Sequence, residues 1–238
     1  LAAPGLDFIR GFFGIQYAGL IATTSYPPHP RRVDRTLNRL QAIVSSCEPS
    51  VALATTSMMD FAKQLGLSAI DLNSIPISTR STDVPVPVKS TATAFLQYTS
   101  GSTREPRGVM LTHRNVLNNL AFIKERFGHS RESVGVIWLP PYHDMGLIGG
   151  ILQPLFAGFP VVLLNPLHVL QRPMRWLNAI THYHATTSGG PNFVFDQCAD
   201  FVTEEQKSQL DLSSWQVAFC GAEAVRPATW QRFSDAFA

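Results

Sequence analysis

The sequence predicts an α/β fold built from mostly parallel sheets layered with helices. Short apolar runs alternate with segments whose apolar residues recur every three or four positions, which is the pattern of a parallel sheet with crossover helices. The run at 161–164 is apolar throughout, as expected for a strand buried on both faces. Of the 238 residues, 45% are hydrophobic, which is enough to fill a substantial core.

The alternation begins at the start of the chain, in a first α/β segment that spans residues 1–72. Phe8, Phe12 and Ile15 lie at helical spacing and predict a buried first helix. The elements predicted after it are a strand at Ile21–Ser25, a helix around Leu37–Val44, a strand at Val51–Thr55, a helix at Met58–Leu65 and a strand at Ala69–Leu72.

A connector at residues 73–93 separates this segment from a second one at 94–238. The connector is rich in Pro, Ser and Thr and shows no sustained period. The elements predicted after it are strands at Ala94–Tyr98 and Val109–Thr112, a helix at His113–Phe127 capped near Thr112, a strand at Gly135–Leu139, a helix from about Asp144, a strand at Val161–Leu164, a helix at Pro173–Tyr183, a strand at Ala185–Ser188, a helix at Asn192–Val202, a strand at Trp215–Phe219 and a last helix from Pro227.

Charge and cysteine content exclude several classes of protein. The 19 basic and 17 acidic residues are spread along the chain, so the net charge of +2 leaves no electrostatic footprint for nucleic acid. The three cysteines form no CxxC pair, which favours a reducing, cytoplasmic setting. Prolines and glycines break the charge-free stretches into pieces too short for a membrane span.

The loop between the strands at 94–98 and 109–112 carries the strongest chemical signal. It combines hydroxyls, glycines and basic side chains, which suits a polyphosphate because glycine lets backbone N–H groups approach the oxygens and a cation supplies charge. An ordinary polar turn is the alternative from composition alone. The spacing excludes a Walker NTPase loop. The candidate binding residues are Thr99, Ser100, Gly101, Ser102, Thr103, Arg107 and Gly108.

Three further segments follow predicted strands, where open α/β sheets place ligands. The first, Trp138–Leu147, puts His143 on a turn before an apolar helix, and a purely structural histidine is the alternative. The second is Thr187–Phe193, for which a tight turn without a ligand is the alternative. The third is Phe219–Pro227, where Cys220 is interpreted as a packing residue.

Residues 98–109 read Tyr-Thr-Ser-Gly-Ser-Thr, then two further residues, and then Pro-Arg-Gly-Val. This order closely resembles the signature loop of the adenylate-forming superfamily, which includes acyl-CoA synthetases and peptide-synthetase adenylation domains. That family usually has Lys at the position of Arg107, so the positive charge is kept. The resemblance runs along nearly the whole chain. His-Asp-Met-Gly-Leu and Gly-Gly-Pro-Asn-Phe are similar to fatty acyl-AMP ligases in particular.

The resemblance implies a role for each segment. The loop at 99–108 binds the phosphates of ATP, with Thr103 at Mg²⁺, and His143 helps to orient the acyl carboxylate. The segment that lines the acyl pocket contains Gly189, Gly190, Pro191 and Asn192. The segment that lies against the adenine contains Gly221, Ala222 and Glu223.

The implied activity is ATP-dependent activation of a fatty acid to an acyl-adenylate, followed by transfer to an acyl carrier protein. A long-chain acyl-CoA synthetase and a noncatalytic nucleotide- or acyl-binding module are the alternatives. The chain would be an incomplete N-terminal AMP-binding domain, because the family's mobile C-terminal domain with its catalytic lysine is absent. We therefore expect the isolated 238 residues not to turn over.

Overall fold

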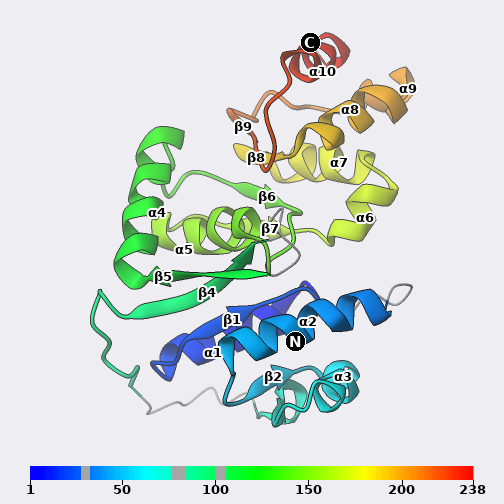
Figure 1. The fold of residues 1–238 in the computed structure, drawn as a ribbon. Coiled ribbons are helices and arrows are strands. Elements are labelled where there is room, and N and C mark those ends of the chain that lie inside the picture. The colour runs from blue at the N-terminus through cyan, green and yellow to red at the C-terminus, as the bar shows by residue number, and fades with distance from the viewer. Residues whose placement is uncertain (28–32, 77–83, 100–105, 238) are drawn as a thin grey trace. The chain divides into compact units, whose positions relative to one another are not determined.

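The computed structural model describes residues 1–27, 33–76, 84–99 and 106–237. The chain forms two compact units, Leu1–Asn118 and Asn119–Ala238, which divide within one helix (Figure 1). The α/β class and the mostly parallel sheets predicted from the sequence are confirmed.

The first unit contains two sheets. In one, β1 pairs in parallel with β4, and β4 pairs antiparallel with β5; in the other, β2 and β3 form a parallel pair. The elements are α1 (Leu6–Tyr17), β1 (Ala22–Thr24), α2 (Val33–Cys47), β2 (Ala52–Ala54), η1 (Thr56–Met58), α3 (Met59–Gln64), β3 (Ala69–Asp71), η2 (Leu72–Ser74), β4 (Thr93–Thr99), β5 (Arg107–Thr112) and the start of α4 (His113–Phe127).

Helix α1 packs against β1 of the first of these sheets (Figure 1). Phe8 and Phe12 are buried, and the Phe12 ring contacts the Phe95 ring of β4 edge to face, with centroids 5.7 Å apart. Since β1 comes before residues 73–93 and its partner β4 comes after them, the predicted connector lies between two strands of one sheet.

Helix α4 begins with a reciprocal cap. The Asn115 N–H donates to Thr112 Oγ1 over 3.1 Å, and the Thr112 N–H donates to Asn115 Oδ1 over 3.1 Å. Two backbone donors at the helix start are thereby satisfied. The helix bounds and the Thr112 cap predicted from the sequence are confirmed.

The second unit is built on a parallel sheet in the order β7-β6-β8-β9. Its elements after α4 are β6 (Gly135–Ile137), η3 (Met145–Leu152), α5 (Gln153–Ala157), β7 (Val161–Leu163), α6 (Pro166–Gln171), α7 (Met174–Tyr183), β8 (Thr187–Gly190), α8 (Asn192–Phe201), α9 (Glu204–Lys207), β9 (Val217–Cys220) and α10 (Pro227–Phe237).

An aromatic core fills the space between this sheet and helices α7, α8 and α10. Trp176 and Phe195 are fully buried, and their rings meet edge to face at 5.4 Å. The Trp176 indole N–H donates to Ser188 Oγ over 2.7 Å, and Ser188 in turn donates to the Val136 carbonyl. These hydrogen bonds satisfy the polar atoms of Trp176 and Ser188 and tie β6, β8 and α7 together.

Strand β8 differs from its predicted bounds. The expected strand at 185–188 is two residues too early, because Gly189 and Gly190 pair with Phe219 and Cys220 of β9. Glycine has a weak intrinsic strand preference, and tertiary pairing overrides it here. The two glycines therefore belong to a buried strand and not to a turn.

Two short helices were missed by the sequence analysis. Helix α6 starts at Pro166 after an Asn165 cap, whose Oδ1 accepts from the Leu167 N–H over 2.9 Å. Helix α9 has a capping box formed by Thr203 and Gln206. Both starts carry readable signals, Asn-Pro and Thr-x-x-Gln.

The helix predicted from about Asp144 is present with unusual geometry. Asp144 is its N-cap, but η3 is a π-helix, a form that is rare and occurs frequently at functional sites. Within the described ranges, no helix is both long and apolar enough to cross a bilayer.

Candidate active site

Three of the predicted site segments follow strands of the parallel sheet in the second unit. His143 comes after β6, Pro191 and Asn192 come directly after β8, and Gly221 comes directly after β9. Parallel strands end at the same edge of a sheet, so these segments share its carboxyl edge. The structure thus places at one edge residues that are up to 78 positions apart in the sequence, from His143 to Gly221.

His143 and Asp144 form a close pair at this edge. Their Nδ1 and Oδ1 atoms lie 2.5 Å apart, and both side chains are partly exposed. The hydrogen bond that His143 Nδ1–H donates to Asp144 raises the pKa of His143 above its usual value, although burial opposes the shift. The same bond lowers the pKa of Asp144. The imidazole is therefore cationic over a wider pH range than a free histidine, which suits a group that attracts a carboxylate.

The turn that carries this pair requires glycine at position 146. A Cβ there would lie 2.0 Å from the Pro140 carbonyl oxygen. Asp144 Oδ1 accepts from the Met145 N–H over 2.7 Å, which fixes the start of η3. The backbone of this turn therefore accounts for Asp144 and Gly146 by itself.

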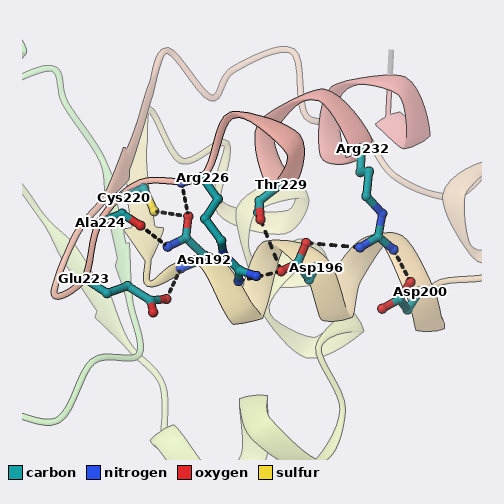
Figure 2. A network of polar contacts seen from close by, with 9 residues as sticks. All are labelled: Asn192, Asp196, Asp200, Cys220, Glu223, Ala224, Arg226, Thr229 and Arg232. Atoms are coloured by element: carbon teal, nitrogen blue, oxygen red, sulfur yellow. Dashed lines mark hydrogen bonds and ion pairs between the residues drawn. The ribbon is translucent and has the colours of Figure 1, made fainter.

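Asn192 links the second and third segments (Figure 2). Its side chain is fully buried, with Nδ2 donating to the Ala224 carbonyl over 2.9 Å and Oδ1 accepting from the Arg226 N–H over 2.9 Å. Its backbone N–H donates to Glu223 Oε1 over 3.1 Å. The residue predicted to line the acyl pocket therefore holds the loop after β9, which contains the residues predicted to lie against adenine.

Glu223 lies at the N-terminus of α8 through this contact, where a carboxylate is favoured by the helix dipole. Ala222, beside it, has a positive φ of 69°. A non-glycine residue in the left-handed region is uncommon and marks a constrained loop. The loop Gly221–Glu223 is therefore held in one conformation by Asn192 and by its own backbone.

Further along α8, ion pairs fasten this helix to α10 and to Arg226, which immediately precedes α10 (Figure 2). Asp196 accepts from Arg226 over 2.8 Å, from Arg232 over 3.2 Å and from Thr229 Oγ1 over 3.2 Å. Arg232 also pairs with Asp200. This network therefore ties the chain that follows the Glu223 loop to helix α8, the same helix whose first residue, Asn192, holds that loop.

Gly189 and Gly190 leave no room for a ligand in this structure. A Cβ on Gly189 would lie 2.0 Å from the Phe219 carbonyl oxygen, and one on Gly190 would lie 2.6 Å from the Trp138 ring. The space next to both glycines is thus filled by protein. Their predicted acyl contact has no support from this packing and stays a prediction.

The predicted phosphate loop belongs to the first unit. Ser100, Gly101, Ser102 and Thr103 lie outside the described residues. Thr99 pairs with Arg107 across β4 and β5, so the two ends of the loop meet, and the Arg107 side chain is exposed there. A Cβ at position 108 would lie 2.8 Å from the Tyr98 ring, so a larger residue there would require that ring to move.

An apolar cavity of about 370 Å³ lies within the second unit. Helix α4 lines it with Asn119, Ile123 and Phe127, which are spaced four residues apart on one face. Its other lining residues come from the sheet, from η3 and α5 and from the loops around them, and they are His129, Gly135, Ile137, Asp144, Met145, Ile148, Gly149, Pro154, Phe159, Thr187, Phe219, Cys220, Gly221 and Ala222.

The three cysteines are free, and two of them lie in the second unit. Burial raises the pKa of the Cys198 thiol to about 12. Burial, together with the nearby Glu223 carboxylate, also raises the pKa of Cys220. Neither thiol is activated as a nucleophile. In the part of the chain that the structure describes, no three His, Cys, Asp or Glu side chains gather as metal ligands.

Comparison with known proteins decides the family. The profile of the AMP-binding enzymes matches residues 1–238. The chain is an AMP-binding enzyme.

This AMP-binding enzyme is 41% identical over 251 residues to the medium-chain fatty acid–acyl-carrier-protein ligase JamA of Moorena producens, with all of the chain and 42% of JamA aligned. It is 36% identical over 251 residues to the long-chain fatty acid–AMP ligase FadD23 of Mycobacterium tuberculosis, again over all of the chain and 42% of the relative. The chain therefore spans about two fifths of the length of these relatives.

A solved structure is similar over the same extent. The fatty acyl-adenylate ligase of L. pneumophila, solved with acyl adenylate and pyrophosphate, superimposes with a TM-score of 0.92 at 45% identity. The match covers 99% of this chain and 41% of that one. The AMP-binding enzyme thus has the fold of the N-terminal part of such ligases.

Sequence reasoning missed most of the cavity of this AMP-binding enzyme. Asn119, Ile123 and Phe127 have the i, i+4, i+8 spacing of one helix face, and that signal was readable. The same spacing is equally expected of a helix face that packs in a core without a cavity. The cavity becomes visible only when the partners of that face are known.

Proposed function

We propose that the whole protein activates a fatty acid with ATP, forms an acyl-adenylate and releases pyrophosphate, and then passes the acyl group to an acyl carrier protein. Activation of fatty acids is in line with the names of the relatives, which include an acyl-carrier-protein ligase and a fatty acid–AMP ligase.

The observation that carries the proposal is the apolar cavity at the predicted site. It is lined mostly by apolar groups, yet it reaches Asp144, the partner of His143, and Gly221 and Ala222, the residues predicted to lie against adenine. An apolar cavity with few polar groups at one end suits a ligand with an alkyl tail and a polar head. A fatty acid has that form.

The residues present fit a nucleotide. An exposed cation, Arg107, lies at the base of a loop rich in hydroxyls, and a guanidinium binds phosphate oxygens well. In the second unit, Asn192 and Glu223 hold the loop expected to contact adenine. Mg²⁺ would share the charge of the leaving pyrophosphate when bound. Its predicted partner, Thr103, lies outside the described residues.

His143 is assigned the role of orienting the carboxylate that attacks the α-phosphate. Its raised pKa favours the cationic form, which attracts a carboxylate, and Asp144 fixes the ring through Nδ1. Positioning of this kind needs no covalent intermediate on the protein.

The proposal is tested on the full-length protein with ATP, Mg²⁺ and a fatty acid. We expect pyrophosphate release that depends on the fatty acid, and transfer of the acyl group to added carrier protein in preference to CoA. Acylation of CoA alone would favour the acyl-CoA synthetase alternative. Nucleotide or fatty acid binding without pyrophosphate release would favour a noncatalytic module.

A further inference from the structure

The apolar cavity has a direction relative to the parallel sheet. At one end it is lined by Asp144, Gly221 and Ala222, which lie beyond the carboxyl ends of strands. At the other end it is lined by Gly135 and Thr187, which are the first residues of β6 and β8 and pair with each other. A chain that enters at the carboxyl edge therefore runs along the sheet toward the amino ends of the strands.

The depth of the cavity follows from this direction. Strands rise about 3.3 Å per residue, so Thr187 and Gly190 are about 10 Å apart, and the level of Gly221 is about 13 Å from that of Thr187. An extended chain advances about 1.2 Å per bond, from the reach of an extended backbone. The sheet thus accommodates an alkyl chain of about 8 to 11 bonds.

The cavity is also large enough for such a chain. It measures about 370 Å³, and a chain of about ten methylene groups at roughly 30 Å³ each fits within that volume.

The inner end of the cavity is lined by a wall of buried, packed side chains. His129 is only 7% exposed, and its ring lies against Phe159 with centroids 4.9 Å apart. Nε2 lies 3.2 Å from Thr187 Oγ1, and Nδ1 lies 3.3 Å from the amide of the fully buried Gln153. Both ring nitrogens are therefore satisfied inside the protein.

Gln153 ties this wall to helix α4. With its amide oriented to satisfy every partner, Nε2 donates to the Leu120 carbonyl over 3.0 Å, and Oε1 accepts from the Lys124 N–H and from His129 Nδ1, each over 3.3 Å. An alkyl chain that extended past His129 would break this network and leave buried polar groups unpaired, which is costly.

We propose that the wall formed by His129, Thr187 and Phe159 ends the acyl site and makes the enzyme select fatty acids of about 8 to 12 carbons. This inference rests on the proposed function and specifies its substrate. It is independent of the names of the relatives, which include both a medium-chain and a long-chain ligase.

The test measures acyl-adenylate formation by the full-length protein with saturated acids from hexanoic to octadecanoic acid. We expect kcat/KM to be highest between octanoic and dodecanoic acid and to fall about tenfold or more for hexadecanoic acid, since a few unaccommodated methylenes cost that much. Equal kcat/KM for decanoic and hexadecanoic acid would overturn the inference while leaving the proposed function intact. Absence of adenylate with every acid would overturn both.

Two variants address the wall and the wider cavity. His129→Ala is expected to shift the preference toward longer acids. Because that variant can fail to fold, the second fills the cavity instead. Gly149 lines the cavity, and a Cβ there meets no atom within 4 Å, so Gly149→Leu is expected to shift the preference toward hexanoic acid. Gly14→Leu is the matched control, at an exposed glycine of α1 whose Cβ also meets no atom within 4 Å. An unchanged chain-length profile in Gly149→Leu would contradict the proposal.

Discussion

At the scale of single residues, His143 and Asp144 show how one hydrogen bond sets the charge of a site. The pKa of His143 is raised above 6.5, so its contribution to stability is complete below that value and is lost as pH rises through the raised pKa. The pKa of Asp144 is lowered below 3.8, so its contribution is present above that value and is lost as pH falls through the lowered pKa. The pair is therefore strongest between these two reference values.

We predict that Asp144→Asn lowers the pKa of His143 toward the value of a free histidine, because the main cause of the raised pKa is removed. NMR titration of the imidazole C–H signals measures the change. The effect on stability is expected to be small, about 1 kcal/mol or less, because both side chains are partly exposed. Asp60→Asn is the control, since among the described residues the Asp60 carboxylate forms its ion pair with Lys63. An unchanged His143 titration in Asp144→Asn would contradict the assignment.

Gly146 shows a steric requirement at the same turn. We predict that Gly146→Ala destabilises the protein by about 3 kcal/mol or more, because the new Cβ collides with the rigid Pro140 carbonyl. Gly149→Ala, in the same π-helix with open space at its Cβ, is expected to be within about 1 kcal/mol of the parent protein. Denaturant unfolding compares them, and equal stability of the two variants would show that the turn adjusts.

At the scale of elements, α8 and α10 are joined by aromatic packing and by the ion pairs of Asp196. Phe195 contacts the rings of Trp230 and Phe233 at 4.7 and 5.2 Å. The Asp196 carboxylate is 19% exposed, so its ion pairs are less screened than those of a surface pair. Packing supplies most of the attraction between the helices, and the ion pairs fix how they are aligned.

We predict that Asp196→Asn weakens α10 by about 1 kcal/mol, because it removes the charge shared by Arg226 and Arg232. Hydrogen exchange of the α10 amides should become faster in this variant than in the parent. Asp200→Asn is the matched control, since Asp200 is more exposed and pairs with Arg232 alone among the described residues. Exchange rates that rise equally in both variants would argue against a special role for Asp196.

At the scale of the whole molecule, the predicted nucleotide residues are distributed over both units. The loop with Arg107 is in the first unit, and the loop with Glu223 is in the second. Each unit holds its part with local contacts, such as the Thr99 to Arg107 pairing and the Asn192 hydrogen bonds. If these predictions hold, nucleotide binding draws on residues of both units.

We predict that the isolated 238 residues give no steady pyrophosphate release with ATP and a fatty acid, whereas the full-length protein does. The chain spans 42% of the length of JamA, and the resemblance places the catalytic lysine outside it. A coupled pyrophosphate assay compares the two proteins at equal concentration. Steady turnover by the 238 residues would show that they contain all of the catalytic groups.

Much of the fold was readable because its signals are local. Helix α4 was predicted with its bounds, since Thr112 and Asn115 form a cap that the sequence itself contains. Strand β8 was placed two residues too early, since pairing with β9 and not local preference decides where Gly189 and Gly190 lie. The π-helical form of η3 also escaped prediction, because no local signal separates it from an α-helix.

The sequence by itself determined the α/β class, the segments that end at the carboxyl edge and the resemblance of the hydroxyl-rich loop, because these depend on periodicity and on residues close together in the chain. Only the tertiary structure decided that Asn192 supports the Glu223 loop and that His129, Thr187 and Phe159 meet at the end of a cavity. Those contacts join residues 24 to 58 positions apart, as in Gln153 with His129 and His129 with Thr187. Such contacts depend on how distant segments pack together, and no single position in the sequence specifies that packing.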